Sequence, residues 1–525
     1  MTSKTKNVQR LKKSICKVLG LHKEINLKEP YLEEEGEQYG GTAFFIDPLH
    51  FGEKFPVSPH KRYLLTNYHV IETLETNKCS LHYPEHGLSY INAKVEFILP
   101  KFDVAILSVN PRDDHPMWLV GSIADFLESI PNLQLFDKIV KGNSQDVIAV
   151  GFPNLSSDYQ ICDGIISGRG LGMIQLNISF NGGNSGGPLF HKNKVIGICT
   201  ASISESEALG LAVPMTQILN YFQKWTEYDH HILTVPSWGI IANTTTNDYL
   251  EYHDIDKAYK GALVNKIVPG SSVDKILKPK DILMGISSAD KRYSIDQYGL
   301  LKADWTDKRV PIDDHEFLTS LDPNDITISF FQNRTKKMQT RKVILRRQHS
   351  KVRDIYPNWE ENKYMICGGC VFMNLSMNHF NSDDEDESYI PFHKSIPLSN
   401  HVADTLRQEN VVVVTHIPFQ SHVHNQRILM PFDRVVKFNN KKVKGIAHMQ
   451  KLFQEVVEEV NLNNRKPFIV LETQDTKVYL NMHMLRKDDE KNKSKESYPV
   501  NKLLLLKLKP LKQKTKKRKR GRAQV

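Results

Sequence analysis

Short apolar runs, separated by turns rich in Gly, Pro and Asn, fill the chain from about residue 36 to 222. Runs of this length that end at turn residues are typical of β-strands in closed or stacked sheets. The spacing changes at Val213–Phe222, where apolar residues recur at helical intervals. The pattern predicts a two-barrel, all-β domain at 36–222 that ends in a helix.

A polar, histidine-containing stretch at 226–236 predicts a linker, and a second unit follows at 237–348. Its predicted elements are a short helix at Ser271–Leu277, a buried strand from Asp281, and a closing hairpin of Asp325–Phe331 and Arg341–Leu345 across Gln332–Gln339. A generic small α+β domain remains the alternative for this unit.

A third unit is predicted at 357–488, again with mixed strand and helix patterns. The expected strands are Tyr364–Phe372, Val411–Thr415, Asp433–Val443 and Phe468–Thr473, and the expected helix is Ile446–Val460. Five adjacent acids in Ser382–Ser388 repel one another, so we expect a solvated loop there; a site for a cation or a basic partner is the alternative.

The first 35 residues are expected to form an extension to the folded domains. Lys12, Lys13 and Lys17 beside Ile15, Val18 and Leu19 predict a short amphipathic helix, with a transit peptide as the alternative. No apolar h-region follows the basic start, so we expect no secretory signal. No apolar stretch approaches the 18 or so residues of a membrane span, so no span is expected.

The net charge of +10 is concentrated at the C-terminus. Lys512–Arg522 contains eight basic residues and no acid, and without them about +2 remains. The tail at 489–525 is therefore expected to be the one strong basic feature, and its end to be disordered. Lys516–Arg520 resembles a nuclear localisation signal, and such a run equally fits contact with nucleic acid or importin.

The six cysteines are Cys16, Cys79, Cys162, Cys199, Cys367 and Cys370, scattered along a large chain. This scatter favours a reducing compartment over a disulfide framework. With the tail, it predicts an intracellular protein, nuclear or else cytoplasmic, and not secreted. Cys367 and Cys370 have the spacing of a metal or redox pair, but no second pair exists and their apolar neighbours favour a buried strand, so no metal is expected.

The chemistry is concentrated in Gly183-Asn-Ser-Gly-Gly-Pro188. Glycines around a serine allow a tight turn close to a substrate carbonyl, where the amides of Gly183 and Ser185 would face a developing oxyanion. A serine hydroxyl is a poor nucleophile and needs a base and an orienting carboxylate. The sequence therefore predicts that Ser185 is a nucleophile with two upstream partners.

Both partners have suitable contexts. His69 follows the apolar run that begins at Tyr63, and Asp103 opens the apolar run to Leu107, where a carboxylate entering a buried strand needs a partner. Taken singly, either residue is more often structural. The order His69, Asp103, Ser185 is that of chymotrypsin and not of subtilisin or the α/β-hydrolases.

Three segments resemble the signatures of the Deg/HtrA serine proteases: Thr66-Asn-Tyr-His-Val70, Asp103-Val-Ala-Ile-Leu107 and Gly183-Asn-Ser-Gly-Gly-Pro-Leu189. Further agreement lies at Gly40–Ile46, Val150–Pro153, Lys194–Ile198 and Gly210–Pro214. Gly182 and Tyr68 depart from the family, which more often has proline and alanine there. The resemblance implies a mainly β chain, with a chymotrypsin-like double β-barrel followed by two PDZ-like α+β domains, as in plant-type Deg proteases.

The resemblance also implies site residues. Ser179, six residues before the nucleophile, would floor an uncharged specificity pocket that favours small or medium apolar side chains. Cys199, Thr200 and Ala201 would form the strand edge that pairs with substrate, and Gly261, Ala262, Leu263 and Val264 the loop and strand at which a PDZ-like unit docks a peptide.

The resulting hypothesis is an ATP-independent serine endopeptidase that cleaves misfolded or exposed polypeptides, without a cofactor and as a trimer or a multiple of trimers. No Walker-type phosphate loop is present, which agrees with ATP independence. One alternative is a PDZ-based scaffold or chaperone with little proteolysis. Another is a nucleic-acid-associated factor that binds through its tail.

Overall fold

The computed structural model describes residues 11–32, 36–84, 90–112, 120–140, 142–170, 172–202, 209–225, 227–347, 350–380, 390, 394, 398–399, 401, 407–462, 464–494, 497–500 and 503–509. The chain divides into two compact units. The first comprises Met1–Glu24 and Glu35–His349, and the second comprises Ile25–Glu34 and Ser350–Val525.

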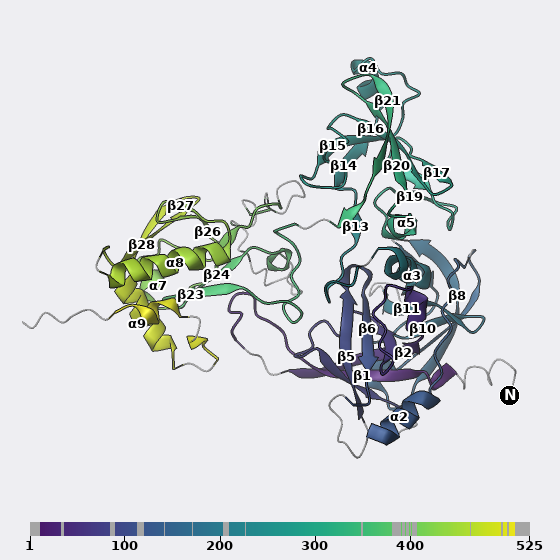
Figure 1. Ribbon diagram of the computed structural model, residues 1–525, viewed down its shortest axis with the longest axis horizontal. Coiled ribbons are helices and arrows are strands. Elements are labelled where there is room, and N and C mark those ends of the chain that lie inside the picture. Colours follow the sequence, from purple (N-terminus) through teal and green to yellow (C-terminus); the bar gives the residue numbers. More distant parts are fainter. Residues whose placement is uncertain are drawn as a thin grey trace, which may run out of the picture. The chain divides into compact units, whose positions relative to one another are not determined.

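Two closed six-stranded barrels form the larger part of the first unit (Figure 1). The first has the order β1-β2-β3-β6-β5-β4, and the second has the order β10-β11-β12-β9-β8-β7. The strands of the first barrel are β1 Ile15–His22, β2 Glu37–Ile46, β3 Arg62–Thr66, β4 Lys78–His82, β5 Tyr90–Leu99 and β6 Val104–Val109. Those of the second are β7 Asp146–Gly151, β8 Gln160–Gly170, β9 Met173–Leu176, β10 Pro188–His191, β11 Lys194–Ser202 and β12 Gly210–Pro214. The short 3₁₀ turns are η1 Pro48–Phe51, η3 Pro100–Phe102 and η4 Pro153–Leu155.

One hydrophobic cluster joins the two barrels to the helix that follows them. Phe44 of the first barrel, Phe190 of the second and Tyr221 of α3, Met215–Lys224, all belong to it. Helix α3 confirms the predicted closing helix, while α2, Val120–Ser129, is not anticipated by the sequence pattern. The shared core fixes the barrels against each other, which matters because the candidate triad draws on both.

The N-terminal segment differs from expectation. Ile15–His22 is strand β1, paired with both β2 and β4, and not a helix in an extension. Ile15, Cys16 and Val18 are buried in the barrel. A short apolar run fits a buried strand as well as a helix, so only its long-range partners decide which forms.

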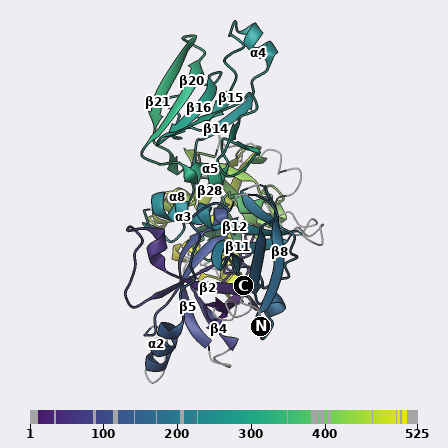
Figure 2. The same cartoon turned by 90° about the vertical axis from the view of Figure 1, so that its right-hand side faces the viewer.

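A second sheet completes the first unit, with the order β14-β15-β16-β20-β21 and β17 attached to β16 (Figure 2). Its elements are β13 Pro236–Ser237, β14 Ile240–Thr244, α4 Asn247–Tyr252, β15 Ala262–Ile267, β16 Ile282–Ser288, β17 Lys291–Ser294, β18 Leu300–Lys302, β19 Arg309–Pro311, α5 His315–Ser320, β20 Ile326–Gln332, β21 Lys337–Val343 and β22 Arg346–Arg347. Two expectations are corrected: Ser271–Leu277 forms turns, and the second hairpin strand begins at Lys337 instead of Arg341.

The second unit is a sheet of order β23-β24-β25-β26-β28-β29 with β27 on β26. Its elements are β23 Tyr364–Cys367, β24 Cys370–Asn374, η5 Met377–His379, β25 Val412–His416, α7 His422–Gln426, β26 Arg434–Phe438, β27 Lys441–Lys442, α8 Ile446–Asn461, β28 Phe468–Thr473, β29 Lys477–Asn481, α9 Met482–Asn492 and η7 Leu504–Lys507. Helix α8 confirms the predicted amphipathic helix. The predicted strand Tyr364–Phe372 is instead a hairpin, because Gly368 and Gly369, at φ 60° and 77°, form its turn.

Two segments far from this sheet in sequence complete its core. Leu27 is buried against Ile366 and Val371, with Tyr31 packed beside it. Leu505 is fully buried in the cluster that α8 covers. The predicted tail at 489–525 is therefore wrong for its first part, which folds onto the sheet. The expectations for residues 382–388 and 512–525 lie outside the described residues.

Candidate active site

The three predicted catalytic residues come from three separate segments of the double barrel. His69 lies three residues after the end of β3, and Asp103 lies between η3 and β6. Ser185 lies between β9 and β10 of the second barrel. Asp103 has left-handed backbone angles, φ 54° and ψ 48°, which aspartate tolerates better than most residues. The double barrel thus brings residues from both sheets to one place.

His69 and Asp103 make two contacts. The carboxylate Oδ2 of Asp103 lies 2.8 Å from Nδ1 of His69, and its Oδ1 accepts the backbone N–H of His69 at 2.9 Å. One aspartate therefore holds the ring and the backbone of the same histidine. A proton on Nδ1 leaves Nε2 as the basic nitrogen, which is the tautomer a general base needs.

Thr200 links the aspartate to the serine. Its hydroxyl donates to Asp103 Oδ2, and its backbone carbonyl accepts the Ser185 hydroxyl at 2.8 Å. Because a hydroxyl has one proton, Ser185 in this conformation donates to Thr200 and not to His69. Rotation about the serine side chain is needed before the histidine can take that proton.

Asn67, which sequence reasoning did not select, also connects the segment that carries Asp103 to the segment that carries Ser185. It is fully buried, donates from Nδ2 to the Asp103 carbonyl at 2.8 Å, and accepts the Gly186 N–H at 2.6 Å. Its position two residues before His69 is the only signal in the sequence. The pairing itself depends on the meeting of the two barrels.

The glycines around Ser185 are required by their surroundings. A Cβ on Gly183 would lie 2.2 Å from the Phe152 carbonyl oxygen, and one on Gly186 would lie 2.0 Å from the Thr42 carbonyl oxygen. Both glycines have positive φ, 94° and 86°. The Thr42 hydroxyl donates to the Gly183 carbonyl at 2.7 Å, so the loop is fixed to the first barrel as well.

The loop at 152–155 is hydrogen-bonded to the segment that carries the predicted oxyanion residues. The Asn154 N–H donates to the Gly182 carbonyl at 2.5 Å. In a trans peptide the C=O and N–H point in opposite directions, so the Gly183 N–H points away from Asn154. Lys17 of β1 is buried and donates to the Leu155 carbonyl at 2.9 Å, which ties this loop to the N-terminal strand.

Comparisons with known proteins agree with this geometry. The family model for a trypsin-like peptidase domain matches residues 41–198, and that for a PDZ domain matches residues 356–492. A protease of Arabidopsis thaliana designated Do-like 3, mitochondrial, is 24% identical over 471 residues, covering 85% of this chain and 73% of its own length. The chain therefore has a trypsin-like peptidase domain and a PDZ domain, and its relatives are Do-like, DegP-like and HtrA proteases.

Other similarities cover less of the chain. A periplasmic serine endoprotease, DegP-like, of Marinomonas sp. strain MWYL1 is 28% identical over 247 residues, which are 44% of this chain and 47% of the relative. The solved structure of the HtrA-type protease AlgW with a decapeptide covers 66% of this chain and all of its own, at 19% identity and a TM-score of 0.44.

The relatives overturn the predicted location. Three Do-like relatives of Arabidopsis thaliana are named mitochondrial, and the DegP-like relative is named periplasmic. They point to an organelle or an exported location, and the prediction of a nuclear or cytoplasmic protein is wrong. The scattered cysteines and the basic tail are weak evidence for a cellular location, since neither feature alone directs a protein to a compartment. In the part of the chain that is described, no helix is long and apolar enough to cross a membrane.

The predicted substrate-binding residues of the protease differ in their exposure to solvent. Ser179 is exposed, between the buried side chains of Ile178 and Phe180. Cys199 is buried, and burial raises the pKa of its thiol, so it is not a reactive group. Thr200 and Ala201 lie in β11 beyond Ile198, the last residue that pairs with β10.

The predicted peptide-docking segment Gly261–Val264 is corrected by the sheet order. Ala262 and Leu263 pair with β14 on one side and with β16 on the other. A Cβ on Gly261 would lie 2.3 Å from the Leu283 carbonyl oxygen, so glycine is needed there because the neighbouring strand leaves no room for a side chain. A peptide strand adds only to an unpaired edge, and on this side of the sheet that edge is β14.

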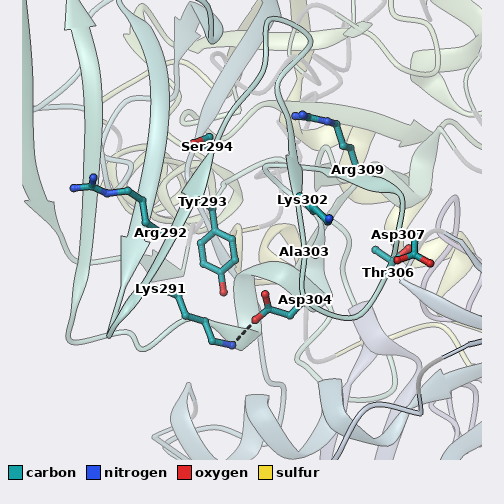
Figure 3. Close-up of a pocket in the computed structure, with 10 residues that line it drawn as sticks. All are labelled: Lys291, Arg292, Tyr293, Ser294, Lys302, Ala303, Asp304, Thr306, Asp307 and Arg309. Atoms are coloured by element: carbon teal, nitrogen blue, oxygen red, sulfur yellow. Dashed lines mark hydrogen bonds and ion pairs between the residues drawn. The ribbon is translucent and has the colours of Figure 1, made fainter.

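A cavity of about 590 Å³ lies between β17 and the β18–β19 hairpin of this sheet (Figure 3). Lys291 and Asp304 form an ion pair at its rim, and Arg309 pairs with Asp296 at 3.2 Å. None of its lining residues belongs to the triad. No cluster of three metal-ligating side chains occurs among the residues that the structure describes.

Proposed function

We propose that this protein is an ATP-independent serine endopeptidase in which Ser185 is the nucleophile, His69 the base and Asp103 its orienting partner. One observation carries the assignment. The Asp103 carboxylate contacts both His69, at 2.8 Å, and the Thr200 hydroxyl, while the Thr200 carbonyl holds the Ser185 hydroxyl. The three side chains are thereby joined in one hydrogen-bonded cluster.

The geometry supports hydrolysis through an acyl-enzyme. Ser185 leaves the Thr200 carbonyl and gives its proton to His69 Nε2 as its oxygen attacks the substrate carbonyl. The amides of Gly183 and Ser185 receive the negative charge that develops on the carbonyl oxygen. His69 then protonates the leaving amine, and water releases the acyl group by the same steps in reverse.

Substrates are proposed to be misfolded or exposed polypeptides, because a chain segment must enter as an extended strand beside Thr200 and Ala201.

Assembly as a trimer or a multiple of trimers is part of the same proposal, and light scattering of the full chain tests it. Contact of the basic tail with a polyanion remains a prediction; it requires binding that weakens with salt and is lost when 512–525 are removed.

Casein cleavage by Ser185→Ala tests the proposal. We expect a loss of at least about a thousandfold, because the covalent route disappears while substrate binding remains. Ser129→Ala, an exposed serine at the end of α2, is the matched control and should cleave as the wild type does. Equal cleavage by Ser185→Ala and wild type would exclude Ser185 as the nucleophile.

The similarity to named proteases favours this function over a scaffold or chaperone with little proteolysis. If Ser185→Ala retained full chaperone activity while the wild type cleaved no protein substrate, the scaffold would be the better description.

A further inference from the structure

One edge of the β14–β21 sheet is formed by β21, Lys337–Val343 (Figure 2). It pairs with β20 without interruption from Gln332↔Lys337 to Ile326↔Val343. Within the described residues no strand lies on its other side, so alternate N–H and C=O groups along seven residues face outward. All its side chains except Gln339 and Val343 are exposed.

This edge is strongly basic. Arg334–Arg347 contains seven basic residues and no acid. Among described side chains, Arg347 pairs with Asp229 at 3.6 Å, whereas the other six have no carboxylate within ion-pair distance. The net charge of the chain without its tail is therefore close to zero even though a second strongly basic segment is present. This corrects the expectation that the tail is the one strong basic feature.

A cavity of about 440 Å³ lies at the C-terminal end of the strand. Lys342 and Arg346 line it from the strand side, and Lys275 lines it from the turn opposite. The single acid there, Asp274, already accepts the Gly270 N–H at 3.0 Å. The Ser271 hydroxyl is buried and has no hydrogen-bond partner in the described part of the protein. Three cations thus line the cavity, and one of its lining residues carries an unpartnered hydroxyl that is itself buried.

We propose that β21 binds an extended acidic segment of a substrate polypeptide, which adds to the sheet as a further strand. The carboxylates would lie against Lys337 and Arg341 on one face of the sheet and against Lys342 on the other, and one acidic side chain would enter the cavity beside Ser271. The role as a substrate tether rests on the proposed protease function, whereas the binding itself does not.

Two features favour a polypeptide over a nucleic acid. The outward N–H and C=O groups match a peptide backbone, which a nucleic acid cannot supply. Met338 and Ile344 are large exposed apolar residues, 42% and 60% accessible, at the same edge. Cations at a sheet edge also prevent pairing between copies of a protein, so the experiment must separate this role from binding.

The test uses full-length protein carrying Ser185→Ala, so that binding is measured without cleavage. The probe is a fluorescent 12-residue peptide that repeats Glu-Glu-Val-Val, so that an added strand carries Glu on both faces, and binding is measured by fluorescence anisotropy. We compare Lys337→Glu/Arg341→Glu/Lys342→Glu with Lys257→Glu/Lys260→Glu/Lys266→Glu, which changes the same charge at exposed positions elsewhere in this domain. We expect the edge variant to bind at least about tenfold more weakly and the control to bind as the parent does. A peptide N-methylated at alternate residues should also lose binding.

Circular dichroism shows that each triple variant folds. The same triple changes in protein that keeps Ser185 are assayed on a short uncharged peptide, and its hydrolysis shows that the catalytic site is intact. Equal peptide binding by the edge variant and its parent overturns the proposal, as does full binding of the N-methylated peptide. Tighter binding of a 12-nucleotide DNA strand than of the peptide assigns the edge to nucleic acid. If the peptide does not bind and the edge variant forms larger oligomers, the charges only keep copies apart.

Discussion

Asn67 shows how much of the candidate site depends on a single buried amide. It joins the backbone of Asp103 to that of Gly186, and so fixes the carboxylate loop against the serine loop. Neither partner is close to it in sequence. We assign it as a positioning residue, because it touches no reacting atom.

Asn67→Ala should lower kcat by about tenfold or more, since two buried hydrogen bonds of about 1 to 1.5 kcal/mol each are lost at groups that align the triad. KM should change little. Asn67→Asp keeps the acceptor for Gly186 but sets a carboxylate oxygen against the Asp103 carbonyl, so it should not recover the lost activity. Steady-state kinetics with a short peptide checks both variants. A lower melting temperature with unchanged kcat would mean that the amide is only structural.

At this scale the sequence indicates the candidate catalytic side chains more readily than the hydrogen bonds that connect them. His69, Asp103 and Ser185 each lie in a short motif of consecutive residues, so a single sequence is enough to select them as candidates. Asn67, Thr42 and the Thr200 hydroxyl each form a hydrogen bond across the barrels, and no local pattern encodes which strands meet. The docking segment at Gly261–Val264 failed for the same reason, because its pairing on both sides is a property of the sheet.

At the scale of elements, helix α5 contacts helix α3, and strand β1 contacts the loop at 152–155. Helix α5 packs on α3, where the Trp225 indole donates to the Thr319 carbonyl at 3.1 Å. Glu316 of α5 is buried and lies 3.3 Å from Arg169. Burial raises the pKa of Glu316 to about 7, although Arg169 opposes the shift.

This shift makes stability depend on pH. Between its ordinary value of 4.5 and about 7, the folded state keeps a proton on Glu316 that the unfolded state has lost. The free energy of unfolding of the first unit should therefore fall as pH rises through this window, by on the order of 3 kcal/mol. Glu316→Gln should remove most of that slope. Denaturant unfolding at pH 5 and pH 7.5 measures it, and an equal slope in both proteins would refute the assignment.

Strand β1 allows a second prediction, because its Lys17 reaches the loop beside the predicted oxyanion site. Lys17→Met keeps most of the apolar stem but removes the hydrogen bond to the Leu155 carbonyl. We expect a few-fold lower kcat with KM nearly unchanged, from a loop that is less fixed. Lys23→Met, at the end of the same strand, is the comparison in the same kinetic assay. An equal effect of both changes would point to general destabilisation of β1.

Helices α3 and α8 were predictable because their periodic apolar faces are long enough to be unambiguous. Strand β1 was not predictable in this way, because eight mostly apolar residues fit a helix as well as a strand. Only the pairing with β2 and β4 decides between the two. The hairpin at Cys367–Cys370 was missed because its turn residues lie inside an apolar run.

At the scale of the whole molecule, the chain leaves the first barrel after β1, contributes residues 25–34 to the second unit, and returns as β2. Leu27, 4% exposed, fills the core of that second unit. Leu27→Ala should lower the free energy of unfolding of the second unit by about 2 to 4 kcal/mol, and that of the first far less. Calorimetry that resolves the two transitions checks this, with Leu32→Ala, a more exposed leucine, as the control. A shift confined to the barrels would contradict the division.

This route of the chain limits how the protein can be recombined with its relatives. Cutting between the barrels and the C-terminal part at one point leaves Leu27 and Tyr31 without the side chains that cover them. A chimera that imports a foreign C-terminal half should therefore also import the donor's counterpart of residues 25–34. Two junctions are needed, one on either side of that loop, in addition to the obvious one near residue 350.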